Sequence, residues 1–313
     1  MSKRGWLLFA AMAVIWGIPY LLIRIAVRDL TPGMLVFART GLGALLLAPI
    51  AARRGMLRPV FAKWRIMLVY SVVEIAVPWL LLSHAETKLS SSLSGLLVAS
   101  VPLIGAVIVM AAPGRSQSHR HEEDRLTAVR LAGLLIGLAG VAVLVGVDVQ
   151  VDNALAVVEI AVTAVGYATG PIIIARRLAD LPSLGVVAVS LAMTAIGYIP
   201  FAATQWPAHV TAEVGWSVAG LAVICTALAF VIFFALIAEV GPARATVITY
   251  LNPAIALLLG VVVLGEKFTV GIAVGFPLTL AGCFFATSRN RTPAAGSADA
   301  GGRFVAIPEV AEP

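Results

Sequence analysis

Ten apolar stretches of membrane-crossing length constrain this chain more than any other feature. An α-helix needs about 20 consecutive apolar residues to cross a bilayer. Of the 313 residues, 60% are hydrophobic and 12% are charged, whereas a soluble domain carries about 25% charged residues. We therefore predict an all-α membrane protein. The ten predicted transmembrane helices are Trp6–Ile23, Gly33–Ile50, Ile66–His84, Ser91–Ala112, Val129–Val147, Ala154–Ala175, Leu184–Ala203, Val214–Leu236, Ala243–Leu264 and Val270–Ala286.

Lysine and arginine are distributed unequally over the loops between these helices. If the N-terminus is cytoplasmic, most of the 22 basic residues lie in cytoplasmic segments. The opposite loops hold Arg24, Arg28, Lys88 and Lys267. Because cytoplasmic loops are enriched in Lys and Arg, we predict a multi-pass protein of the cell (inner) membrane with both termini cytoplasmic. The net charge of +6 then reflects orientation in the bilayer, and no nucleic-acid partner is expected.

The two halves of the chain resemble each other at an offset of 151 residues. The segment AVIWG at 13–17 aligns with AVGYA at 164–168, and Pro102 aligns with Pro253. Further along the chain the offset falls to 142, because the basic loop of the first half is longer. Several matches in the same order indicate that the chain arose by duplication.

Each half contains five predicted helices, and an odd number places the second half upside down in the membrane relative to the first. We predict a first repeat over residues 1–147 and a second over residues 148–286. A tail over residues 287–313 is small, polar and rich in Pro and Gly, so we predict that it is disordered and cytoplasmic. Inverted repeats are the construction of many secondary transporters, which bind substrate near mid-membrane between the repeats.

Several motifs resemble those of one transporter family. They are Trp16-Gly17, TPGMLVFAR (Thr31–Arg39), Pro102 and YLNPAIALLLGVVVLGEKFT (Tyr250–Thr269). Together with a Gly-rich last helix, they are similar to the drug/metabolite transporter superfamily, EamA type. The resemblance implies ten helices in two inverted repeats, and export of amino acids, other metabolites or drugs without nucleotide hydrolysis. The chain departs from the family pattern in the first half, where the acidic residue expected near the end of helix four lies beyond a longer loop, in Glu122–Asp124.

Glu74 is a carboxylate inside an apolar span. A charge at the bilayer centre costs roughly 2.5–3.5 kcal/mol on insertion scales, so such residues usually face the bundle interior. Arg39 is the other charged residue placed deep in a predicted span, about 9 Å from its end at 1.5 Å per residue. Three roles of Glu74 stay open: ion-pair partner of Arg39, substrate group in a cavity, and proton coupling.

Prolines interrupt several predicted helices near the middle of the membrane. Pro78 has no N–H, so the carbonyl of Glu74 is left without its helical partner and the helix tends to kink. Pro102 and Pro253 have the same effect on their helices. Free carbonyls at this depth are tolerated only beside protein partners or water, so the three prolines are predicted helix kinks that favour a polar cavity.

Three more residues are candidates for lining that cavity. Trp16 and Tyr167 occupy equivalent positions in the two repeats and lie too deep for an interfacial aromatic belt. Asn252 is polar and deep beside a proline. Packing is the alternative for the two aromatic residues, and hydrogen bonding between helices is the alternative for Asn252. With Arg39 and Glu74, these residues form the predicted substrate cavity.

Motifs for other chemistries are missing from the sequence. It contains no G-x-x-x-x-G-K-[ST] phosphate loop, no H-E-x-x-H zinc motif and no G-x-S-x-G elbow. Cys225 and Cys283 lie in apolar segments and are expected to be buried free thiols. No metal or other cofactor is expected. Near one helix end, His84 and Glu86 are expected to form a solvated rim.

These observations predict a secondary transporter that is not an enzyme. It moves small metabolites or drugs across the membrane, as an exporter, by alternating access of a cavity between the two halves. Its partners are a small-molecule substrate and the lipid bilayer, with proton coupling among the open roles of Glu74. A channel-like facilitator and an uptake permease are the alternatives on the same fold. A lipid-modifying intramembrane enzyme would have to use Ser83, His84 and Glu86.

Overall fold

The computed structural model describes residues 2–111, 128–241, 245 and 247–287. Over these residues the chain is helical and contains no strand. Nine helices are long and apolar enough to cross a membrane, and a further apolar helix, Ile248–Leu264, is shorter. The predicted all-α membrane fold is confirmed. The predicted tail from residue 288 onward and the acidic segment Glu122–Asp124 lie outside the described residues.

The N-terminal half comprises the described residues up to Asp148, and some of its transmembrane segments consist of two or three helical pieces. In it, α4 is a short helix between two spans and η1 is a π-helix. The pieces are α1 (Lys3–Gly17), α2 (Pro19–Ala26), α3 (Pro32–Arg53), α4 (Leu57–Ala62), α5 (Trp64–Tyr70), η1 (Ser71–Ala76), α6 (Val77–Ala85), α7 (Ser91–Val98), α8 (Val101–Ala111) and α9 (Ala128–Asp148).

The C-terminal half comprises the described residues from Val151 onward. It begins with a single 3₁₀ turn, η4, and contains two π-helical segments, η5 and η6. The pieces are η4 (Val151–Asn153), α10 (Ala154–Ile173), η5 (Ile174–Leu178), α11 (Ser183–Thr204), α12 (Ala212–Ala222), η6 (Val223–Leu228), α13 (Ala229–Val240), α15 (Ile248–Leu264) and α16 (Val270–Thr287).

Local sequence signals set several helix ends. The hydroxyl of Thr31 accepts a hydrogen bond from Met34 N, and Pro32 follows at the first helical position of α3. A side-chain acceptor at the N-cap and a proline just inside it are typical of helix starts. At the other end of a helix, Gly265 adopts a left-handed conformation (φ 66°) and ends α15, a position that favours glycine because it has no Cβ.

The three predicted kink positions differ in the structure. Pro78 lies just after η1, where the transmembrane helix changes from π to α geometry. Pro102 follows a break at Ala99–Ser100 that separates α7 from α8. Pro253 lies inside α15, which stays continuous.

Of the three π-helical segments among the described residues, η1 and η6 each lie near the middle of a membrane-spanning segment. η1 begins at Ser71 and η6 at Val223, which is within one residue of the 151-residue offset between the halves. A π segment adds a residue to a helical turn and is frequent at functional sites. Glu74 lies in η1, and Cys225 and Thr226 lie in η6.

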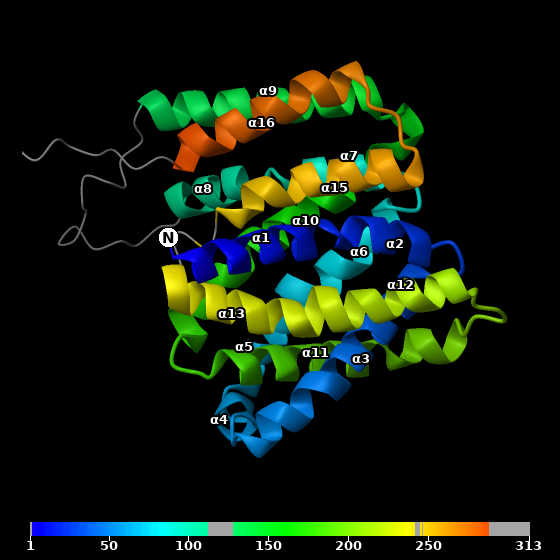
Figure 1. The fold of residues 1–313 in the computed structure, drawn as a ribbon, viewed down its shortest axis with the longest axis vertical. Helices are drawn as coiled ribbons and strands as arrows, with labels where there is room; N and C mark the ends of the chain where they lie inside the picture. The colour runs from blue at the N-terminus through cyan, green and yellow to red at the C-terminus, as the bar shows by residue number, and fades with distance from the viewer. Residues whose placement is uncertain (1, 112–127, 242–244, 246, 288–313) are drawn as a thin grey trace, which may run out of the picture.

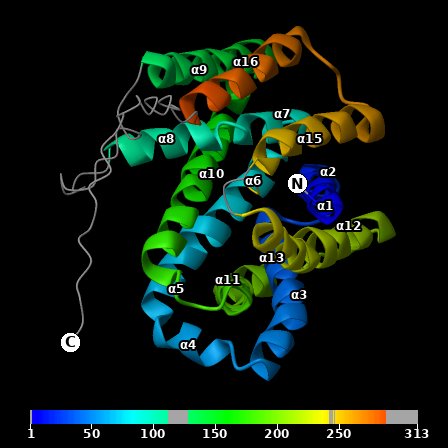
Figure 2. The same ribbon diagram turned by 60° about the vertical axis from the view of Figure 1, so that its left-hand side comes forward.

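Helices of the N-terminal half pack mainly on helices of the C-terminal half. α9 packs on α16 at one edge of the bundle, and α3 packs on α11 toward the opposite edge (Figure 1). Between them, α6 packs on α10, α1 on α13 and α15, and α7 on α15. The view turned by 60° shows α9 and α16 side by side again, above α7 and α15 (Figure 2).

Glycines let α9 and α16 approach each other closely. A Cβ at Gly282 of α16 would collide with the backbone of Gly137 in α9, and a Cβ at Gly140 would collide with the backbone around Thr279. Small residues at such contacts allow backbones to pack tightly in membranes, where no hydrophobic effect drives helices together. The Gly-rich character of the last helix therefore has a packing reason.

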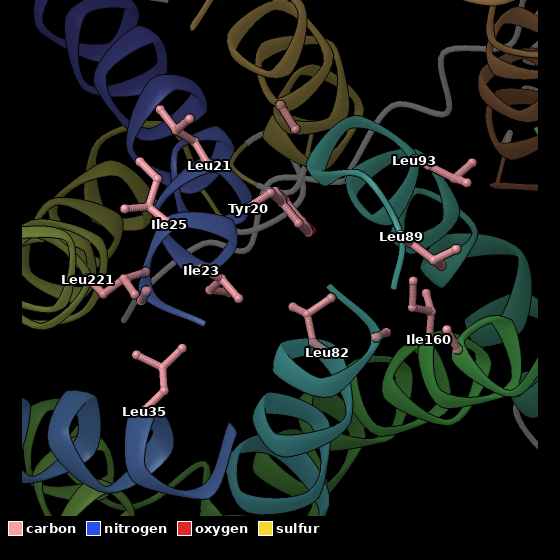
Figure 3. Packing of buried hydrophobic residues seen from close by; sticks show 14 of the residues in the cluster. Tyr20, Leu21, Ile23, Ile25, Leu35, Leu82, Leu89, Leu93, Ile160 and Leu221 are labelled. Carbon is pink, nitrogen blue, oxygen red and sulfur yellow. The ribbon is translucent and has the colours of Figure 1, made fainter. Parts of the chain in front are cut away.

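The largest apolar cluster joins both halves near the middle of the bundle (Figure 3). Ile23 of α2, Leu35 of α3 and Leu82 of α6 point toward one another in this view, with Leu221 of α12 beside them. All four are buried. The cluster thus links helices that are far apart in the sequence.

Polar contacts connect the loops at each end of the bundle. At one end, Thr211 N and its hydroxyl donate to Asp29 Oδ2 at 2.9 and 2.7 Å. We call this the predicted external end; it contains residues 27–31, 86–90 and 265–269. At the other end, Lys63 Nζ lies 2.6 Å from Asp180 Oδ1. Loops predicted to share one side of the membrane therefore contact one another.

Candidate substrate site

Arg39 is a buried guanidinium within the transmembrane part of α3. Its side chain is 8% exposed. Nε donates a hydrogen bond to Thr226 Oγ1 at 3.0 Å, and Cζ lies 3.6 Å from the centroid of the Trp79 ring. A cation over an indole face is attracted by the negative face of the ring, most strongly where water is excluded. Trp79 and Thr226 thus fix the position of the guanidinium.

The π-helical geometry of η6 presents Thr226 to Arg39. The Thr226 hydroxyl donates to Leu221 O, five residues earlier, at 2.8 Å. Its oxygen keeps a lone pair free, and this lone pair accepts the bond from Arg39 Nε. Since Arg39 belongs to the N-terminal half and Thr226 to the C-terminal half, the contact lies between the two halves.

Polar side chains from three other elements approach the guanidinium. Three of them lie close enough to interact electrostatically with Arg39: Tyr20 of α2, Tyr167 of α10 and Cys225 of η6. We call Tyr20, Arg39, Trp79, Tyr167 and Thr226 the central cluster. Within the described part of the chain, no carboxylate lies at ion-pair distance from Arg39.

Glu74 does not form the ion pair with Arg39 that was one of its three predicted roles. Its carboxylate faces α10 instead, where a Cβ at Gly170 would collide with it. Oε2 is buried and has no hydrogen-bond partner among the described residues. Tyr167 lies within electrostatic range of Glu74 as well as of Arg39. The substrate and proton-coupling roles of Glu74 stay predictions.

Trp16 and Asn252 both lie in contacts between helices. The Trp16 ring packs on Phe233 at 4.7 Å and on Phe230 at 6.5 Å between ring centroids. In the amide orientation that satisfies its donors, Asn252 donates to Ala13 O of α1 at 3.3 Å and to Ile248 O at 2.9 Å. This geometry supports the alternative for Asn252, a hydrogen bond between helices.

The expected solvated rim at the end of α6 is wrong for Glu86. Glu86 is 0% exposed, and Arg24 Nη1 donates to its backbone carbonyl. His84 is 46% exposed and lies 2.8 Å from Glu159 Oε1, so it is paired. Ser83, the third residue that a lipid-modifying enzyme would have to use, is also buried.

The sequence reasoning missed most of the central cluster around Arg39. Trp79 directly follows Pro78, and Thr226 falls almost opposite Glu74 when the two halves are aligned, so both positions carried a signal. Tyr20 carried none, because an aromatic residue beside a proline in a membrane helix is ordinarily packing. Cys225 and Cys283 are buried free thiols, as predicted.

The central cluster has the chemistry of an anion site. The Arg39 guanidinium has five N–H donors, and Nε uses one of them on Thr226. The Nη groups suit a planar carboxylate or a phosphate, which guanidinium binds through two parallel hydrogen bonds. Aromatic side chains beside them provide apolar surface for the rest of a small molecule. The described residues hold no group of three His, Cys, Asp or Glu side chains suited to a metal ion.

Comparisons with known proteins agree on one family. The family model "EamA-like transporter family" matches residues 3–146 and again residues 154–288. The chain is 24% identical to the uncharacterized transporter YvbV of Bacillus subtilis (strain 168) over 95% of each chain. It is 27% identical to the uncharacterized inner membrane transporter YedA of Escherichia coli (strain K12), over 83% of this chain and 82% of YedA.

One solved structure shows the same fold. This structure, titled "Crystal structure of protein", superposes on the chain with a TM-score of 0.63 and is 21% identical to it in sequence. The superposition covers 92% of this chain and 97% of that chain. At this identity the likeness concerns the fold alone.

Proposed function

Because the chain belongs to the EamA-like transporter family of the drug/metabolite transporter superfamily, we propose that it is a secondary transporter exporting small metabolites that carry an acidic group. The substrate binds at the central cluster, and the two halves move to expose it to each side of the membrane in turn. The membrane-spanning helices and the relatives named as transporters support this proposal.

The observation that carries the substrate proposal is the state of Arg39. A buried charge normally has an opposite charge beside it, because an unpaired one is costly. Arg39 is held by a ring and a hydroxyl, and no carboxylate of the described residues lies at ion-pair distance. An acidic substrate would complete this site, and its carboxylate would face the guanidinium.

Two features support movement of the halves around this site. The π segments η1 and η6 lie at nearly equivalent positions, as expected of repeats. The packing of α6 on α10 corresponds to that of α13 on α1 when the halves are aligned. Inverted repeats give two similar ways of packing one half against the other, which is the basis of alternating access.

The apolar cluster of Figure 3 includes residues that lie between the central cluster and the predicted external end along their helices. Leu35 precedes Arg39 by one turn, and Leu221 precedes Cys225 by one turn, each on the side of the predicted external end. A substrate at Arg39 would have to pass these buried side chains to leave. We infer that their separation is part of the outward opening.

Metabolite profiling of the medium around expressing cells tests this proposal. We expect acidic metabolites to accumulate outside, and Arg39→Ala to reduce their accumulation about 10-fold or more, since a charged hydrogen bond contributes roughly 1.5–3 kcal/mol. Arg39→Lys should restore only part of it, because an ammonium lacks the planar fork. The control is Arg58→Ala, an exposed arginine.

The outcomes separate the alternatives on this fold. Unchanged accumulation with correctly inserted Arg39→Ala would contradict the proposed site. Depletion of a metabolite from the medium would indicate an uptake permease. Flux that neither saturates nor shows counterflow would indicate a channel-like facilitator. Glu74→Gln in the same assay tests whether that carboxylate serves the transport cycle.

A further inference from the structure

Glu86 is a buried carboxyl group that the proposed substrate site does not use. It lies directly after α6, at the C-cap, and is 0% exposed. Neither Oε1 nor Oε2 has a hydrogen-bond partner among the described residues. An ionised carboxylate buried without hydrogen bonds is strongly disfavoured, whereas the protonated form is neutral and far less costly to bury.

The groups around Glu86 come from three helices and from the connection between α15 and α16. Arg24 of α2 donates to the Glu86 backbone carbonyl and leaves the carboxyl oxygens free. Arg24, Arg39 and Glu266 act electrostatically on the carboxyl group, and Glu86 in turn acts on Tyr20 and Tyr167. Glu86 therefore lies within electrostatic range of the central cluster.

Unlike Glu86, Glu266 has a hydrogen-bond donor for each of its two carboxylate oxygens. Its two oxygens accept hydrogen bonds from Ser91 N at 2.7 Å and Ser92 N at 2.9 Å. These are the first backbone N–H groups of α7, where the helix dipole favours negative charge. A negative charge on Glu266 opposes a second negative charge on Glu86.

A cavity at the predicted external end is lined by residues that neighbour Glu86. Its volume is about 470 Å³, and Arg24, Thr87 and Glu266 are among the residues that line it. Thr87 follows Glu86 in the chain, and Arg24 binds the Glu86 carbonyl. The carboxyl group therefore lies next to residues that form the wall of a polar cavity.

From this arrangement we propose that Glu86 is a proton-binding site of the transporter, protonated in the described conformation and able to exchange its proton with water in this cavity. In the exchange, the O–H bond of the carboxylic acid breaks and the proton passes to a water molecule; the reverse step restores the acid. The use of this proton in transport rests on the proposed function, but the presence of the proton does not.

The surroundings agree with a protonated group near neutral pH. Burial raises the pKa of Glu86 well above its ordinary value, and Glu266 raises it further, while Arg24 and Arg39 lower it. The loss of hydration outweighs the two arginines because neither of them forms a hydrogen bond with the carboxyl oxygens. Raised pKa values of buried carboxyl groups are common at sites of proton transfer.

The position of Glu86 also predicts how the proton and the substrate affect each other. Arg39 favours the ionised form of Glu86. An acidic substrate on Arg39 would offset that positive charge, so substrate binding favours protonation of Glu86. By linkage, protonation must favour substrate binding by the same factor. The substrate and the proton are therefore expected to favour each other's binding in the described conformation.

Infrared spectroscopy of the full-length protein in lipid nanodiscs tests this proposal without any substrate. The carbonyl stretch of a protonated carboxylic acid is followed while the pH is raised from about 5 to 10. This interval lies above the ordinary pKa values of carboxyl groups. We expect the band at neutral pH to be weaker in Glu86→Gln than in the wild type, because one protonated carboxyl group is lost. Glu213→Gln is the matched control, because Glu213 is 61% exposed and paired with Arg28.

Two results would overturn the proposal. One is a band in Glu86→Gln equal to that of the wild type at neutral pH. The other is a Glu86-dependent band in the wild type that sodium abolishes at constant pH, which would make the site a cation site. If Glu86→Gln does not insert into the membrane, Glu86→Asp replaces it. The band of this variant should be present at neutral pH and should disappear at a different pH from that of the wild type. Because the spectrum needs no substrate, failure of the export assay leaves this test intact.

Discussion

At the scale of single residues, Glu74 and Gly170 show how a buried carboxylate is accommodated between two helices. The Glu74 side chain reaches α10 where Gly170 has no side chain. Gly166, one turn earlier, lies against the Val73 carbonyl and Pro78 in the same way. Small residues on α10 thus provide the space for the π segment and for the proline that follows it.

Replacing Gly170 with alanine should therefore be harmful. The added methyl group collides with the Glu74 carboxylate, and overpacking of this kind costs about 1–3 kcal/mol. We expect a lower midpoint of thermal unfolding in detergent. The double variant Gly170→Ala/Glu74→Ala should recover much of the loss.

Gly197→Ala is the matched control in α11. A Cβ at Gly197 meets nothing within 4 Å, and alanine in place of glycine inside a helix is favourable by about 0.5–1 kcal/mol. This variant should be as stable as the wild type or more so. Equal effects of the two alanine variants would contradict the collision at Glu74.

At the scale of elements, one polar contact connects the α4–α5 junction with the connection between η5 and α11. Lys63 Nζ donates to Asp180 Oδ1 at 2.6 Å, to Oδ2 at 2.9 Å and to Arg177 O at 3.0 Å. The hydrogen bond from Lys63 lowers the pKa of Asp180 below its ordinary value. Both residues lie outside the spanning helices.

The stabilisation by this contact should depend on pH. A carboxyl group with a lowered pKa in the folded state contributes stability above its unfolded pKa, and the contribution is lost as the pH falls through the folded pKa. Lys63→Met should lower the thermal midpoint slightly at pH 7, because exposed ion pairs contribute little. As the pH falls through the lowered pKa of Asp180 and this carboxylate becomes protonated, the difference from the wild type should shrink.

The control for this experiment is Arg58→Met, which removes another exposed charge of the same loop region. It should show no such dependence on pH. A difference between Lys63→Met and the wild type that stays constant from neutral to acidic pH would mean that Asp180 does not carry the effect.

At the scale of the whole molecule, the membrane orientation predicted from the basic residues is open to a direct test. The two natural cysteines are buried, so they give little background with a maleimide reagent that does not cross membranes. Lys88→Cys and Arg58→Cys introduce single exposed thiols at opposite ends of the predicted topology. We expect intact cells to label at position 88 and not at position 58.

Permeabilised cells provide the comparison for the labelling experiment. There, both introduced thiols should react, which shows that position 58 is accessible once the reagent can enter. Labelling at position 58 in intact cells, together with protection of position 88, would reverse the predicted orientation. The assignment of the external cavity near Glu86 would then reverse with it.

Much of the fold and part of the site were predictable from the sequence, and the limits have a physical cause. The apolar lengths of the spans and the helix break near Pro102 are local properties. Arg39 was identifiable because a charge in an apolar run is costly wherever it lies. Its contacts were not: the expected partner was Glu74, whereas the observed one is Thr226, 187 residues away.

The sequence by itself determined the class of this protein: apolar length, the positions of glycine and proline, and the distribution of charge specify helices in a membrane. Only the tertiary structure decided which side chains meet Arg39 and that Glu86 is buried, not solvated. The physical reason is that the bilayer acts on each segment alone, through transfer of its residues from water. Contacts between segments depend instead on close packing of side chains from distant parts of the chain.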